Sequence, residues 1–152
     1  MATASFEDQL QGLREEIEEA RRDLVRVIEG VPADAFGLAP RGEWSIERIL
    51  RHVVQSEQLY ASVISMLRRK SAEMAPKLPD GFESGAEVVR ALAESRRMIV
   101  AALDGVTEDE FYEMRQVGLN DESVKSTLEN LAMHDHEHAS QIEKTVAEVG
   151  SA

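Results

Sequence analysis

The stretch that decides the fold is SVKSTLENLAMHDHEHASQIEKTVAEVG, residues 123–150. Its apolar side chains recur every three or four residues, the period of a helix with one buried face. Within this pattern His134 and His138 stand one turn apart and project together, whereas His136 points toward solvent. Read as a strand, the segment would align all three imidazoles, but the surrounding period is helical. We therefore expect one long helix that presents a histidine pair.

Three further segments show the helical period, and each opens at a serine that suits an N-cap. They cover residues 5–29, residues 45–70 and a segment that starts at residue 84. Ser84 and Glu87 have capping-box spacing, and Thr107-Glu108-Asp109-Glu110 predicts a short helical piece through Tyr112. The apolar stripe of the second segment comprises Ile46, Ile49, Leu50, Val53, Leu59, Tyr60, Ile64 and Leu67.

The sequence predicts an all-α protein, a four-helix bundle that forms one domain over residues 1–152. No alternating strand pattern of useful length and no internal repeat is found. The connections at residues 31–44, 71–83 and 105–122 exceed the tight loops of a minimal bundle. We expect them to lie over the helix ends, where they would form the walls of a site. Four amphipathic helices of similar length favour a bundle.

Composition excludes several functions. The net charge of −12 argues against nucleic-acid and anionic membrane partners. There is no cysteine, so thiolate metal sites and a cysteine nucleophile are excluded. The basic clusters Arg21-Arg22, Arg68-Arg69-Lys70 and Arg96-Arg97 are interpreted as solvated faces. No signal peptide or membrane span is evident, and we expect a cytoplasmic protein.

The histidines suggest a metal site. His52 lies at the edge of the second helix's apolar stripe, and the pair His134 and His138 lies at the edge of the last one. An i, i+4 pair and one imidazole from a facing helix suit one divalent ion, with Zn or Ni first and Fe as a further candidate. Such a site keeps positions for water or substrate. Di-iron, hemerythrin-like and thermolysin-like sites need motifs that this chain lacks.

Asp135 falls near the middle of the apolar face, where an unpaired charge is costly. We therefore expect it to have a partner, and two interpretations stay open. It could orient a histidine ligand or bind a loop donor. Alternatively, it could form a structural ion pair with an arginine or a contact with Trp44.

Two motifs resemble the DinB/YfiT-like superfamily. Residues 44–54, WSIERILRHVV, resemble its second-helix signature, a Trp-Ser start followed by a histidine. Residues 134–142, HDHEHASQI, resemble its C-terminal His-x-x-x-His signature followed by Gln-Ile. The resemblance covers nearly the whole chain and implies a four-helix bundle, commonly a homodimer, with His52, His134 and His138 as metal ligands. Relatives include transferases and isomerases that use low-molecular-weight thiols, such as mycothiol-dependent maleylpyruvate isomerase and bacillithiol transferases.

These observations favour a metal-dependent thiol S-transferase or isomerase acting on a small-molecule substrate. The ion would lower the pKa of an incoming thiol, which the protein itself lacks. The candidate pocket residues are Trp44, Tyr60, Gln141, Arg41 and, in the loop before the second helix, Phe36 and Pro40. Arg41 could hold an anionic group, Tyr60 could donate a proton, and Gln141 could merely pack against the neighbouring helix.

Two alternatives belong to other classes. One is a non-catalytic, metal-stabilised binding or stress-response module, whose site would be closed by a fourth protein ligand such as Asp135. The other is a metal-free bundle.

Overall fold

The computed structural model describes residues 4–150 and confirms the all-α, four-helix-bundle prediction. Two strands and a short helix are added to the four long helices. The elements are α1 (Phe6–Glu29), α2 (Ile46–Leu67), α3 (Gly85–Leu103), α4 (Glu108–Tyr112), β1 (Arg115–Val117), β2 (Asn120–Glu122) and α5 (Val124–Gly150). No helix within the described range is long and apolar enough to span a membrane.

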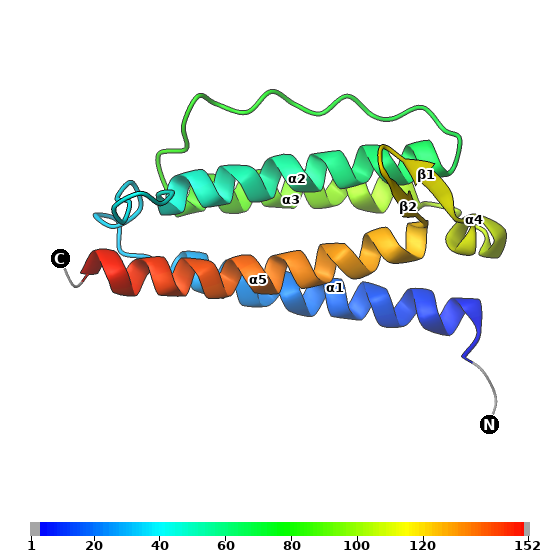
Figure 1. Ribbon diagram of the computed structural model, residues 1–152, viewed down its shortest axis with the longest axis horizontal. Helices are drawn as coiled ribbons and strands as arrows, with labels where there is room; N and C mark the ends of the chain where they lie inside the picture. Colours follow the sequence, from blue (N-terminus) through cyan, green and yellow to red (C-terminus); the bar gives the residue numbers. More distant parts are fainter. Residues whose placement is uncertain (1–3, 151–152) are drawn as a thin grey trace.

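The topology has one long crossover. In Figure 1, α1 and α5 run in one direction and α2 and α3 in the other. Because α2 and α3 are parallel, the chain must travel back along the length of the bundle after α2 ends and before α3 begins. The extended connection over residues 68–84 does this. The prediction that this connection lies over a helix end was wrong. It runs along the outside of α2, where the Gln58 amide donates to the Pro76 carbonyl at 3.4 Å and the Phe82 N–H donates to Glu47 at 2.9 Å.

The helix starts follow the predicted caps. Ser5, Ser45 and Ser84 each accept the backbone N–H three residues ahead, at 3.1–3.2 Å. The capping box at Thr107 and Glu110 is complete. At Ser84 the box is altered, because the Glu87 carboxylate accepts the N–H of Glu83 at 3.0 Å rather than that of the N-cap.

The sequence did not predict the β-hairpin before α5. Its three-residue strands are too short to show an alternating pattern. The pairing of Val117 with Asn120 leaves a two-residue turn in which Gly118 has φ of +63°. Glycine suits the first position of such a turn because it adopts positive φ without strain. The guanidinium of Arg115 donates to the Met66 carbonyl at 2.8 Å, which ties the hairpin to the end of α2.

Two apolar clusters form the core, one toward each end of the bundle. The first contains Leu24, Ile28, Ile49, Leu50, Val53, Leu92 and Ile142 among others. The second contains Leu13, Ile17, Ile64, Met98, Ile99, Phe111, Leu128 and Leu131 among others. Leu59, predicted on the buried stripe of α2, is instead 63% exposed.

Between the clusters lies a charged layer, made of Arg21, Glu57, Ser95, Arg96 and Asp135. Glu57 and Asp135 are each only 1% exposed. Arg21 donates to Glu57 at 2.6 Å and to Asp135 at 3.0 Å, while Arg96 donates to Glu57 at 2.9 Å and Ser95 does so at 2.7 Å. Within residues 4–150, no buried side-chain N or O atom lacks a partner. This satisfies the requirement that buried charges be paired and hydrogen-bonded.

The charged layer overturns the interpretation of the basic clusters as purely solvated faces. Arg21 and Arg96 point inward, and Arg68 is 5% exposed because it donates to the Ala102 and Asp104 carbonyls at the end of α3. The neighbouring Arg22 and Arg97 do face solvent. Adjacent residues on a helix point about 100° apart, so a pair of arginines divides between core and surface.

Candidate metal centre

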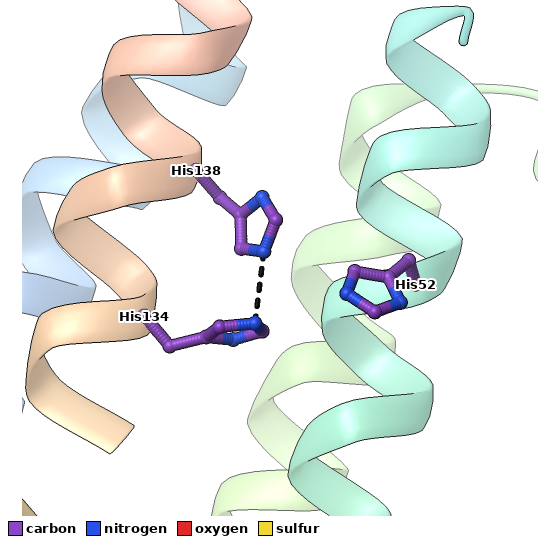
Figure 2. Close-up of side chains that lie close together, drawn as sticks. All are labelled: His52, His134 and His138. Carbon is purple, nitrogen blue, oxygen red and sulfur yellow. Dashed lines mark hydrogen bonds between the residues drawn. The ribbon is translucent and has the colours of Figure 1, made fainter. Parts of the chain in front are cut away.

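Two helices bring the three imidazoles together. His52 lies on α2, and His134 and His138 project from successive turns of α5 toward it (Figure 2). Each of the three offers a ring nitrogen that lies within 4.8 Å of the other two. Among the histidines and carboxylates of the described residues, these three histidines form the group that could hold a metal ion.

The two histidines of α5 are in direct contact. Nε2 of His134 lies 2.9 Å from Nε2 of His138, and the ring of His52 lies 5.6 Å and 5.3 Å from their respective ring centroids. Two nitrogens this close can both lie about 2 Å from one ion, the usual Zn–N distance. The i, i+4 spacing on α5 therefore brings His134 and His138 side by side, as the sequence predicted.

The electrostatics of the site favour neutral imidazoles. Burial, reinforced by the neighbouring His138 and His52, lowers the pKa of His134 to about 4. Burial and the proximity of His138 also lower the pKa of His52. Both rings are therefore neutral at pH 7, which is the form that binds metal ions.

Gln141, which the sequence named as a candidate pocket residue without assigning it a histidine partner, contacts a histidine of the site. Its Oε1 lies 2.8 Å from Nδ1 of His138. An N–H at Nδ1 donates to this oxygen, so the lone pair of His138 stays on Nε2, the nitrogen that faces His134. The contact is local, with i, i+3 spacing, so the sequence contained the signal for it.

Two aromatic residues border the histidines. The ring of Trp44 meets that of His52 edge-on at 5.6 Å, and the Tyr60 ring meets that of His134 at 5.9 Å. Burial, with the nearby Glu122, raises the pKa of Tyr60, so its hydroxyl keeps its proton at neutral pH. Trp44 is 40% exposed and reaches solvent.

Other candidates lie elsewhere. Asp135 turns away from the histidines into the charged layer, where it pairs with Arg21. His136 is exposed and lies 3.4 Å from Asp23. Phe36 is buried in the core, so it does not form an exposed wall. Arg41 is exposed in the loop before α2.

A family model describes most of this chain. The model of the DinB superfamily matches residues 16–142, a span that includes all three histidines of the site. The chain belongs to the DinB superfamily. The two motifs quoted from the sequence fall at the start of α2 and in the middle of α5, where the site is built.

Solved DinB-like structures share this fold. A DinB-like protein from Bacillus cereus is 17% identical, with a TM-score of 0.70 over 95% of this chain and 93% of its own. The DinB-like protein YjoA from Bacillus subtilis is also 17% identical, with a TM-score of 0.66 over 91% and 92% of the two chains. TT2238, a four-helix bundle protein, is 18% identical, with a TM-score of 0.67 over 88% and 96%. No curated protein gives a match.

The donor set of this DinB-superfamily chain fits a divalent ion. Three imidazole nitrogens converge from two rigid helices, and Gln141 fixes the tautomer of one ring. No carboxylate within the described range joins the group, because Asp135 is engaged by Arg21. An ion held by these three residues would therefore keep coordination positions for water or a substrate atom.

Proposed function

We propose that the protein binds one divalent metal ion through His52, His134 and His138 and uses it as a thiol S-transferase or isomerase. The observation that carries the proposal is the convergence of three ring nitrogens within 4.8 Å without a fourth protein ligand from the described residues. Zn and Ni are the first candidates and Fe is a further one. When bound, the ion supplies a Lewis-acid position that lowers the pKa of a coordinated thiol.

The chain's own residues have distinct parts in this proposal. Gln141 holds His138 in the tautomer that leaves Nε2 free. Tyr60, which keeps its proton, can donate a hydrogen bond or a proton to a group above His134. Trp44 forms an apolar wall beside His52. Since the protein has no cysteine, the thiol must come from a low-molecular-weight cosubstrate.

The alternative is a metal-stabilised binding module without turnover. It needs a closed coordination shell, and Asp135 was the residue expected to close it. The carboxylate of Asp135 accepts from Arg21 at 3.0 Å and lies 3.5 Å from Arg96, so it is unavailable to an ion between the histidines. This observation favours the open, reactive site over the closed one. A homodimer and a cytoplasmic location stay predictions.

The test combines metal content and thiol coordination. The purified protein is loaded with Co²⁺, Ni²⁺ or Zn²⁺ and its bound metal is measured by elemental analysis. We expect about one ion per chain, and we expect 2-mercaptoethanol to produce a sulfur-to-metal charge-transfer band with the Co²⁺ form. A loaded site that no thiol perturbs would contradict the transferase proposal and leave the binding module.

Two histidine variants control the assignment. His138→Ala should abolish tight binding because it breaks the pair on α5. His136→Ala changes a histidine only two positions away that faces solvent, so it should bind metal like the wild type. Stoichiometric binding by the first variant, or a large loss in the second, would contradict the ligand assignment.

A further inference from the structure

An arginine that the sequence analysis did not single out lies at the edge of the candidate metal centre. Arg48 is exposed, and its guanidinium lies over the face of Trp44, 4.6 Å from the ring centroid. Trp44 in turn meets His52 edge-on. Arg48 precedes His52 by one turn of α2. Its guanidinium therefore lies on a ring that itself borders His52.

This guanidinium has no anionic partner. Within residues 4–150, the side chain of Arg48 forms no hydrogen bond or ion pair, although the chain carries a net charge of −12. The adjacent Glu47 is directed elsewhere, since its carboxylate accepts the Phe82 N–H from the crossover connection. Two other arginines near the site do have acceptors. Arg51 donates to the Pro79 carbonyl, and Arg21 donates to Asp135 in the charged layer.

The position is also unfavourable for a cation by itself. Arg48 is the third residue of α2, where its N–H donates to the N-cap Ser45 at 3.1 Å. The N-terminus of a helix carries partial positive charge, so a carboxylate stabilises this position and a guanidinium does not. The stacking on Trp44 holds the guanidinium there nonetheless. A planar fork of free donors beside positive potential suits a bound carboxylate.

We propose that Arg48 binds the carboxylate of the substrate or of the thiol cosubstrate, and that the site therefore takes a carboxylate-bearing ligand. This inference rests on the proposed function, because the ligand's other end occupies the position between the three histidines. It assigns to Arg48 the anion-binding role that the sequence suggested for Arg41, an exposed residue of the loop before α2.

The first experiment measures ligand binding to the Co²⁺-loaded protein. The probes are 3-mercaptopropionate and 3-mercaptopropionamide, which have nearly the same shape but differ in charge. Titration of the charge-transfer band should show that the wild type prefers the carboxylate by roughly fivefold, the magnitude of a partly exposed charge-assisted hydrogen bond. Arg48→Gln should lose this preference while its affinity for the amide stays unchanged. Arg41→Gln, which removes the same charge from the loop, should keep it.

The second experiment needs no metal. Trp44 is the only tryptophan, so its fluorescence reports on this spot alone. Iodide, an anion, and acrylamide, which is neutral, are compared as quenchers of the metal-free protein. The ratio of iodide to acrylamide quenching constants should fall at least twofold in Arg48→Gln, recover in Arg48→Lys and stay unchanged in Arg41→Gln.

The outcomes separate the two proposals. If neither thiol produces a band in the wild type, the proposed function fails, and the iodide ratio still decides whether Arg48 attracts anions. If thiols bind but Arg48→Gln keeps the carboxylate preference, or if Arg41→Gln loses it equally, the inference about Arg48 is overturned. An iodide ratio that does not respond to Arg48→Gln would overturn it as well.

Discussion

Nδ1 of His138 lies 2.8 Å from Oε1 of Gln141 on the same helix. The contact links a candidate metal ligand to a residue outside the group of three histidines. Partners of this kind fix the orientation and tautomer of a ligating imidazole. The site is therefore built from more than its three histidines.

Gln141→Ala should lower metal affinity about tenfold, since losing such a partner typically weakens binding 10- to 100-fold and Gln141 is exposed. Competition with a chelator of known affinity measures the change. Gln11→Ala is the matched control, because Gln11 is an exposed glutamine on α1 that bonds to Glu15. Equal affinities in the two variants would mean that Gln141 does not orient the ligand.

Metal should stabilise the fold. A free metal-ion concentration of 100 times the dissociation constant adds about 2.7 kcal/mol to the free energy of unfolding. For a domain of this size the expected rise in Tm is roughly 5–10 °C. A thermal melt with and without Zn²⁺ or Ni²⁺ measures it, and a chelator should reverse it. His52→Ala should show no rise, whereas His136→Ala should respond like the wild type; any other pattern would count against the site.

The metal-free protein should lose stability in mild acid. The pKa of His134 is about 4 in the folded state, against an ordinary value of 6.5. Between these values the unfolded chain binds more protons than the folded one, so the free energy of unfolding falls as pH falls from 6.5 toward 4. His52, whose pKa is also lowered, contributes in the same direction.

Urea unfolding in the presence of a chelator tests this pH dependence. His134→Gln should flatten the curve between pH 6.5 and 4 because it removes one of the groups responsible. His136→Gln, which changes an exposed histidine, should leave the slope as it is. Identical slopes in all three proteins would contradict the assignment.

The two carboxylates of the charged layer should differ in their contribution to stability. Burial raises the pKa of Glu57, but Arg21 and Arg96 outweigh it and the net pKa is lowered. For Asp135, burial dominates and the pKa is raised. The ionised form of Glu57 is therefore the better compensated of the two, consistent with its bonds from both arginines and from Ser95.

Accordingly, Glu57→Gln should destabilise the protein by about 3 kcal/mol, as expected when one partner of a buried ion pair is removed, and Asp135→Asn by less. Denaturant unfolding at pH 7 gives both values. Glu94→Gln is the control, since Glu94 pairs with Arg97 at an accessible surface and should change stability by under about 0.5 kcal/mol. The reverse order for Glu57 and Asp135 would contradict this account.

The sequence predicted features that depend on neighbouring residues. The serine caps, the four long helices and the shared direction of His134 and His138 all follow from interactions within about one helical turn. The contact between Gln141 and His138 is equally local and could have been read from its spacing. The charged residues of the layer, Arg21, Glu57, Arg96 and Asp135, also stood at core-facing positions in the sequence. Only Asp135 was identified as needing a partner.

Tertiary structure decided what meets across helices. Whether His52 faces the pair on α5, and whether Arg21 reaches Asp135 or Glu57, depends on the rotation and axial register of each helix against the others. Those are fixed by the packing of the whole core, to which residues far apart in sequence contribute. The parallel course of α2 and α3 and the path of the crossover are set in the same way. Local sequence thus determined the helices and the ligand pair, and only the assembled core determined the site.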